Sequence, residues 1–132
     1  VGKLKSLYDA LDWLLQQDLV SSSTIFSISL HMKVSGKYSF KREARPTRFM
    51  KDAYRHGVTL VVAAGNSGGK RAAWRSPRAI VVGAMDKSDA IWENSTKSTD
   101  IFAPGVNIKS AWTGSDVIMT TRNGTSAASA HV

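Results

Sequence analysis

A serine close to the end of the chain occupies a position where a nucleophile could be activated. Residues 123–132 are Asn-Gly-Thr-Ser-Ala-Ala-Ser-Ala-His-Val, so Ser126 follows the pair Gly124-Thr125 and opens a run of small residues with high helix propensity. The first turn of a helix carries unpaired backbone N–H groups and the positive end of the helix dipole, and both favour negative charge nearby. Ser126 is therefore either a candidate nucleophile or a simple N-capping residue of the helix.

A second polar residue, Asn66, follows a strongly apolar segment. It comes two residues after the run 58–64, and a pair of glycines comes shortly after it. Functional groups in open parallel sheets collect where strands end at their carboxyl edge, and a side-chain amide placed there can donate to a developing oxyanion. The alternative is a turn asparagine that tolerates left-handed backbone geometry beside glycines.

Helical and buried-strand patterns alternate along the chain and predict an α/β layer fold. Leucines recur at helical spacing from Leu4 to Leu15, which predicts an amphipathic helix of three to four turns. After a polar, basic loop over 36–46, a second helix is expected from Thr47 to about His56, because Gly57 follows in a C-cap position. A last helix is expected to begin at Ser126.

Two of the expected strands are apolar without alternation, which is typical of parallel strands covered by helices on both faces. These are the runs 58–64 and 79–84. The remaining strands are expected at 24–30, 101–105, 106–112 and 117–120.

Composition is that of an ordinary soluble globular chain. The 132 residues are 42% hydrophobic and 21% charged, and at this length residues 1–132 are expected to form at most one domain. The absence of cysteine excludes disulfides, thiolate catalysis and cysteine-ligated zinc. No apolar run approaches the roughly 18 residues of a membrane span, so no membrane partner is expected.

The formal net charge is +8, and much of the positive charge lies between Lys33 and Arg55. Such a block could bind nucleic acid or another acidic surface. Aromatic residues are not interleaved with the charges, and no recognised nucleic-acid motif accompanies them. A solvated basic face is therefore favoured, with a basic nucleic-acid-binding domain as the alternative.

Five short motifs, taken in order, resemble those of subtilisin-like serine proteases. They are SISL at 27–30, HGV with VAAGN within 56–66, VGA at 82–84, DIFAPG at 100–105 and GTS at 124–126. The resemblance runs from about Gly2 to Val132 and is strongest to the proteinase K-like branch, which includes fungal secreted enzymes. It implies a three-layer subtilisin-like α/β fold with a mostly parallel sheet, incomplete because its N-terminal part is absent. It also implies serine endopeptidase activity and secretion.

The same resemblance assigns roles to individual residues. Ser126 would be the nucleophile, and Asn66 would donate to the oxyanion together with the backbone N–H of Ser126. The substrate would be a polypeptide, and the segments that bind it would contain Ser29, Leu30, Ala63, Ala64 and Gly65.

The base and the orienting carboxylate of a serine protease triad are missing from this sequence. In subtilisins both lie N-terminal to the motifs found here, in Asp-Thr/Ser-Gly and His-Gly-Thr segments, and neither segment occurs. Of the three histidines, His56 ends a surface helix and His131 is expected to point away from Ser126; only His31, in the substrate-binding segment, could approach the site. The chain alone is therefore expected to be inactive, with the missing N-terminal segment of the same domain as its partner.

Two departures from the family pattern favour an alternative in which the protein is a catalytically inactive pseudoprotease that serves as a binding module. Residues 31–33 are His-Met-Lys where family members place glycines, which let substrate backbone lie against the strand. The segment between Asn66 and Val82, which carries one wall of the primary specificity pocket in the family, is shortened.

A structural calcium site is also implied by the resemblance, and no organic cofactor is. Its ligands would be the backbone carbonyls of Pro77 and Ala79 and the carboxylate of Asp100, which are hard oxygen donors of the kind that suits calcium. The alternative for Asp100 is an ordinary carboxylate in a surface loop.

Two segments fit the acceptor pattern of N-linked glycosylation. Asn94-Ser95-Thr96 lies in a polar loop, and its pattern has meaning only if the protein is secreted. Asn123-Gly124-Thr125 also fits, but a glycan there would obstruct Ser126.

Overall fold

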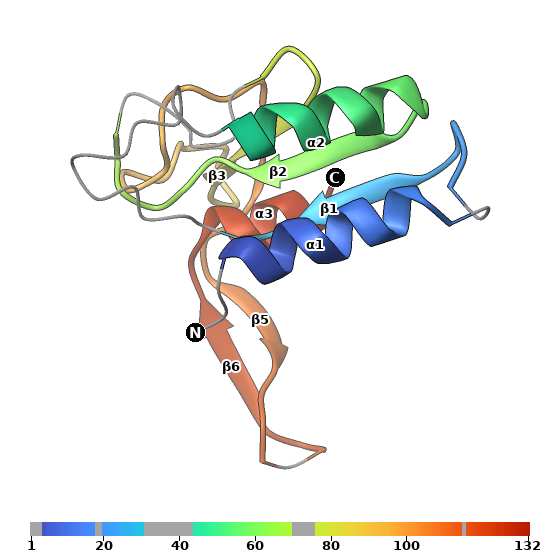
Figure 1. Ribbon diagram of the computed structural model, residues 1–132. Coiled ribbons are helices and arrows are strands. Elements are labelled where there is room, and N and C mark those ends of the chain that lie inside the picture. The colour runs from blue at the N-terminus through green and yellow to red at the C-terminus, as the bar shows by residue number, and fades with distance from the viewer. Residues whose placement is uncertain (1–3, 18–19, 31–43, 70–75, 115) are drawn as a thin grey trace.

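The computed structural model describes residues 4–17, 20–30, 44–69, 76–114 and 116–132. The elements, in chain order, are α1 (Leu4–Leu15), β1 (Ile25–Ile28), α2 (Ala44–Arg55), β2 (Thr59–Ala63), β3 (Ile80–Met85), β4 (Ile101–Pro104), β5 (Ile108–Ala111), β6 (Met119–Arg122) and α3 (Thr125–Ala130) (Figure 1). Within these residues, no helix is long and apolar enough to cross a membrane.

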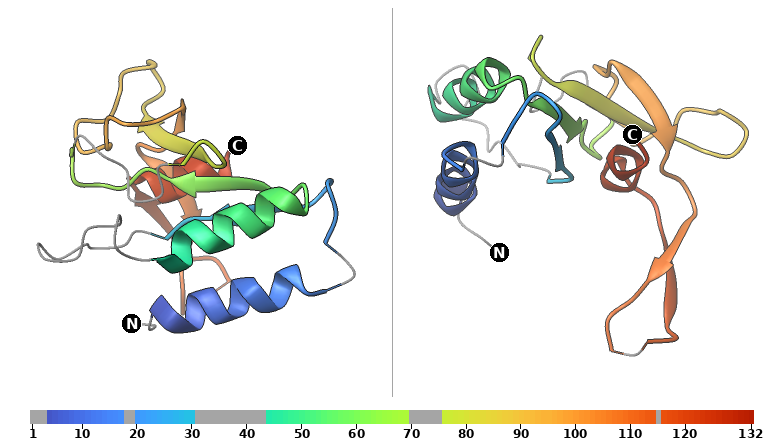
Figure 2. Two further views of the ribbon diagram at one scale, coloured as in Figure 1. Left: turned by 45° about the horizontal axis from the view of Figure 1, so that its top comes forward. Right: turned by 90° about the vertical axis from the view of Figure 1, so that its right-hand side faces the viewer.

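The four strands β1, β2, β3 and β4 form one parallel sheet in that order. Helices α1 and α2 cover one face of the sheet and α3 lies against the other, as the right-hand view of Figure 2 shows. This confirms the predicted three-layer α/β arrangement.

The alternation of side chains along β2 explains why its sequence is uniformly apolar. Leu60 and Val62 pack in a core beneath α1 and α2, while Val61 packs in a second core beneath α3. All three are at most 3% exposed, so both faces of the strand are buried. An unbroken apolar run is therefore required here, as expected for a parallel strand between two helical layers.

The first two helices agree with the sequence pattern except at their margins. Tyr8, Leu11 and Leu15 form the buried stripe of α1, but Leu14 is 36% exposed and lies outside it. Helix α2 begins at Ala44 rather than Thr47, so Pro46 lies in its first turn. The expected loop over 36–46 was therefore predicted to end three residues too late. Proline is tolerated there because the first N–H groups of a helix have no intrahelical partner. The rest of that predicted loop lies outside the described residues.

The last two strands form an antiparallel hairpin that projects from the body of the protein (Figures 1 and 2). The predicted strand over 117–120 was placed two residues too early, because β6 runs from Met119 to Arg122. At the base of the hairpin, the backbone N–H of Asn107 donates to Oδ1 of Asn123 (2.7 Å). This bond fixes the point from which the chain returns to α3.

Gly105 joins the sheet to α3 by close backbone contact. Its N–H donates to the carbonyl of Met85 (2.9 Å), and its own carbonyl accepts from the N–H of Gly124 (2.7 Å). A Cβ atom at Gly105 would lie 2.6 Å from the Cβ of Ala84, 2.8 Å from the carbonyl oxygen of Gly124 and 3.1 Å from the Cβ of Ala128. Only glycine lets the start of α3 approach the sheet this closely.

Candidate active site

Ser126 is the second residue of α3 and lies next to the carboxyl ends of β1 and β2. Its Oγ donates a hydrogen bond to the carbonyl of Ser29, just beyond β1 (2.8 Å). The N-cap of α3 is Gly124, and no side chain caps the helix. The interpretation of Ser126 as an N-capping serine is therefore wrong, and its hydroxyl faces the edge of the sheet where Asn66 also lies.

The carboxamide of Asn66 is held in one orientation by the residue that precedes Ser126. Oδ1 of Asn66 accepts hydrogen bonds from the backbone N–H of Thr125 (3.0 Å) and from its Oγ1 (2.8 Å). Because Oδ1 is occupied, the Nδ2 group is left as the donating side of the amide, and the residue is exposed. The backbone of Asn66 is not left-handed, whereas that of Gly65 (φ 107°) and Gly68 (φ 63°) is, so the alternative of a left-handed turn asparagine is wrong.

Thr125 also belongs to the site, although the sequence alone indicates no role for it. Besides donating to Asn66, its Oγ1 accepts a hydrogen bond from the buried N–H of Gly65 (3.0 Å). The residue is 1% exposed. Thr125 therefore links the start of α3 to the loop after β2 by hydrogen bonds. These bonds hold Asn66 in a fixed position relative to Ser126. The GTS motif contained this threonine, but only the fold reveals what its hydroxyl contacts.

Two further serines connect β1 to α3. The Oγ of Ser29 lies 3.1 Å from the carbonyl oxygen of Ser126 and 2.9 Å from the Oγ of Ser129. Ser129 is 1% exposed and also donates to the carbonyl of Ser126 (3.1 Å). The sequence indicates the contact between Ser129 and Ser126 only through their spacing of three residues, which places them one helical turn apart.

The residues predicted to bind substrate occupy two different environments. Ser29 lies at the site, and Leu30 is 49% exposed beside it. Ala63 and Ala64 are each 2% exposed, and Gly65 is also buried. The second group is therefore enclosed by the structure, while the first group lies nearer the surface.

The described residues provide no base for Ser126, because no histidine or carboxylate among them bonds to its hydroxyl. His56 lies just beyond α2, with Nδ1 2.8 Å from the carbonyl of Asp52. His131 is the exposed C-cap of α3. His31, the histidine that the sequence places nearest to the site, lies outside the described residues. The described part of the chain thus contains a hydroxyl and oriented amide donors, as acyl transfer requires, without a group that removes the proton.

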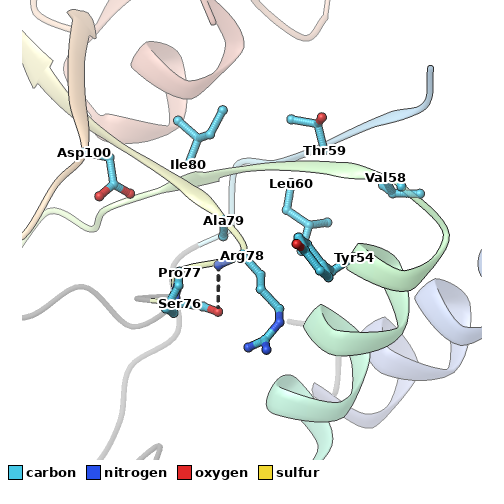
Figure 3. A pocket seen from close by; sticks show the side chains of 11 residues that line it. Tyr54, Val58, Thr59, Leu60, Ser76, Pro77, Arg78, Ala79, Ile80 and Asp100 are labelled. Carbon is cyan, nitrogen blue, oxygen red and sulfur yellow. Dashed lines mark hydrogen bonds between the residues drawn. The ribbon is translucent and has the colours of Figure 1, made fainter. Parts of the chain in front are cut away.

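The candidate calcium ligands lie at the opposite ends of the strands. Pro77 and Ala79 come just before β3, and Asp100 comes just before β4. Pro77, Ala79 and Asp100 line an open cavity of about 610 Å³ (Figure 3). Asp100 Oδ2 accepts a hydrogen bond from the N–H of Val81 (2.9 Å), which holds the carboxylate at the cavity wall.

The chemistry of this donor set fits a calcium ion that keeps several water ligands. One carboxylate and two carbonyls are all hard oxygen donors. The nearby Arg78 is directed toward the ring of Tyr54, 5.5 Å from its centroid, and away from Asp100 (Figure 3). No group of three or more acidic or histidine side chains that could hold a metal occurs among the described residues, so the carbonyls would be essential.

Comparison with known proteins identifies the family. Residues 4–132 match the profile of the Subtilase family. The chain belongs to the subtilase family. This subtilase is 37% identical to alkaline protease 1 of Aspergillus clavatus, over 99% of its own length and 32% of that relative. It is 41% identical over 108 residues to subtilisin-like protease 2 of Pseudogymnoascus destructans, which covers 78% of this chain and 26% of the relative. These fungal relatives confirm the resemblance to subtilisin-like serine proteases of the proteinase K-like branch.

Solved structures confirm the fold of this subtilase. A cold-adapted subtilisin-like serine proteinase superposes with a TM-score of 0.72 at 31% identity, covering 99% of this chain and 45% of that one. The prenylagaramide maturation protease PagA superposes with a TM-score of 0.76 at 20% identity, which shows the shared fold alone. The chain thus spans between a quarter and a third of the length of these fungal relatives and less than half of these structures.

Proposed function

We propose that the protein containing this chain is a serine endopeptidase in which Ser126 is the nucleophile. The observation that supports this most directly is the double hydrogen bond from Thr125 to Asn66 Oδ1, at 3.0 and 2.8 Å. It orients the amide so that Nδ2 donates beside Ser126. The backbone N–H of Ser126, in the first turn of α3, is the second donor to the same point.

The reaction would follow the acyl-transfer sequence of serine proteases. The Oγ of Ser126 attacks the carbonyl carbon of a peptide bond, and its proton passes to a base. The carbonyl oxygen becomes an oxyanion that accepts from Asn66 Nδ2 and from the N–H of Ser126. Collapse of this intermediate releases the amine with the transferred proton, and water then hydrolyses the acyl-enzyme. The polypeptide substrate would lie along Ser29 and Leu30 and beside the segment 63–65.

The base and its carboxylate would come from an N-terminal segment of the same domain, which is the first partner of this chain. Strand β1 lies at the edge of the described sheet, where it pairs only with β2. Ile25 on this strand is 63% exposed. An added segment could pair with the backbone of β1 and cover Ile25, and an unprotected sheet edge is otherwise prone to aggregation.

Labelling with a fluorophosphonate tests the proposal. In the longest natural form of the protein, we expect the probe to form one adduct, mapped by mass spectrometry to the peptide containing Ser126 and lost in Ser126→Ala. In the isolated 132-residue chain we expect neither labelling nor hydrolysis of a chromogenic peptide, because the described residues place no base at Ser126. Ser110→Ala, at an exposed position of β5 away from the site, serves as the matched control and should retain the adduct.

An unlabelled natural form would overturn the protease proposal and leave a pseudoprotease that acts as a binding module. The remaining alternative, nucleic-acid binding by the basic block 33–55, has less support. Part of that block lies outside the described residues, and Arg48 and Arg55 in α2 both pair with Asp52, at 3.6 and 3.2 Å. A nucleic-acid affinity that does not fall with rising salt would eliminate this alternative.

We also propose that the cavity at Pro77, Ala79 and Asp100 binds a structural calcium ion. The natural protein should unfold at a higher temperature in excess calcium than in EGTA. At a calcium concentration 100 times the dissociation constant, the stabilisation is about 2.7 kcal/mol. Asp100→Asn should remove the difference, whereas Asp86→Asn, in an exposed turn, should preserve it. Equal calcium responses in the two variants would contradict the assignment.

Secretion is the third part of the proposal. It is supported by the likeness to fungal proteases and is tested by the presence of the natural protein in culture medium.

A further inference from the structure

Asn94 lies in an exposed turn beside the loop that carries Asn66. The N–H of Ser95 donates to the carbonyl of Trp92 (2.9 Å) and closes the turn, while the carbonyl of Asn94 accepts from the N–H of Gly68 (2.8 Å). The side chain of Asn94 is exposed, and within the described part of the chain its carboxamide makes no hydrogen bond. Its backbone therefore supports the turn, and its side chain is free to carry a substituent.

We propose that Asn94 carries an N-linked oligosaccharide. Asn94 and Thr96 are separated by one residue other than proline, which is the acceptor pattern for this modification. In the transfer, Nδ2 of Asn94 forms a bond to C1 of the first sugar and loses a proton. The bond from C1 to oxygen breaks, and the lipid diphosphate that carried the oligosaccharide leaves with the electron pair. The inference rests on the proposed secretion and not on the proposed catalysis.

The folded turn requires that transfer come before folding. Thr96 is 1% exposed, and its N–H donates to the carbonyl of Gly65 (3.0 Å). Ser95 is also 1% exposed, and its Oγ accepts from the N–H of Ala84 (3.0 Å). A transferase cannot reach the threonine hydroxyl in this state. Once the unfolded segment has been modified, however, the turn can form around it, because only the outward side chain of Asn94 is altered.

The second acceptor pattern, at Asn123, lies in a different environment. Oδ1 of Asn123 accepts from the N–H of Asn107 (2.7 Å) and closes the base of the hairpin. Its threonine is Thr125, whose hydroxyl joins Gly65 to Asn66. A glycan at Asn123 would stand three residues before Ser126 and hinder substrate. The geometry therefore favours Asn94 as the site and leaves Asn123 unmodified.

The test uses the protein purified from the medium of its own organism. Trypsin cleaves after Lys87 and Lys97 and isolates Asn94 in the peptide 88–97, while cleavage after Arg122 places Asn123 in another peptide. Release of the glycan by an amidase in heavy-oxygen water converts each occupied asparagine to labelled aspartate. We expect the label in most copies of peptide 88–97 and none on Asn123.

Variants in the same organism provide the matched controls. Asn94→Gln should remove the mass shift on a denaturing gel, and Asn123→Gln should retain it. Secreted protein with an unlabelled peptide 88–97 would overturn the inference while leaving secretion intact. Protein retained unmodified in the cell would overturn both. Fluorophosphonate labelling of Ser126 should persist in Asn94→Gln, because Gly68 is bound by the backbone carbonyl of residue 94 and not by its side chain. This labelling therefore tests the catalytic proposal independently of glycosylation.

Discussion

Asn66→Asp is expected to lower kcat of the full-length protein by at least 10²–10³-fold, which is about the loss known for removal of one oxyanion donor in subtilisin. The substitution keeps an oxygen to accept from Thr125 N–H and Oγ1, so the hydrogen bonds at 3.0 and 2.8 Å can persist. It removes the Nδ2 donor and places a negative charge where the oxyanion develops. The free energy of unfolding should therefore change little while turnover falls.

Steady-state kinetics with a chromogenic peptide and urea unfolding measure the two effects separately. Because the lost interaction forms only in the transition state, kcat and kcat/KM should fall together, with KM nearly unchanged. Ser67→Ala, at the neighbouring exposed residue of the same loop, is the matched control and should keep wild-type kinetics. A rise in KM with unchanged kcat would assign Asn66 to substrate binding instead.

Gly105→Ala is expected to destabilise the full-length protein by about 1–3 kcal/mol, the usual cost of forcing an extra methyl group into a well-packed core. The new methyl would lie 2.6 Å from Ala84 Cβ and 2.8 Å from the carbonyl oxygen of Gly124. To relieve these contacts, α3 must move away from the sheet. Ser126 then moves relative to Asn66, so kcat should also fall, because a misplacement of about 1 Å can cost 10²-fold.

The midpoint of urea unfolding and the peptidase rate check this expectation. Gly69→Ala is the matched control, since among the described residues its Cβ would contact only the Oγ of Ser67, at 3.2 Å, and that hydroxyl can rotate. The control should lose little stability and no activity. A stable, fully active Gly105→Ala protein would show that α3 tolerates displacement from the sheet and that the close contact is not required.

The elements that were predictable are those in which one local pattern determines the structure. The uniformly apolar runs gave β2 and β3, and Gly57, with φ 75°, ends α2 as its C-cap position indicated. The start of α2 was missed because a proline near a helix start is compatible with both loop and helix. The start of β6 was missed because Val117 is 83% exposed, so its apolar character reflects no burial in the described structure.

Some residues of the site were likewise predictable from their neighbours in sequence, whereas others were not. The motifs marked Ser126 and Asn66, since each is defined by its immediate neighbours. The roles of Thr125 and Ser129 depend on which atoms the fold brings against them, and no spacing in the sequence encodes a contact to Gly65 or Ser29. Roles for the substrate segments and the calcium ligands stay predictions, because they concern molecules that bind to this chain.

The bonds between Ser29 and Ser126 also have a kinetic consequence. Each joins residues 97 positions apart in sequence. Contacts of such long range form late, because the entropy of closing the intervening loop must be overcome before they stabilise anything. During synthesis, Ser126 meets the strand end only after nearly all of this chain has emerged from the ribosome. Under the proposed function, the nascent chain therefore cannot use Ser126 as a nucleophile before its sheet is complete.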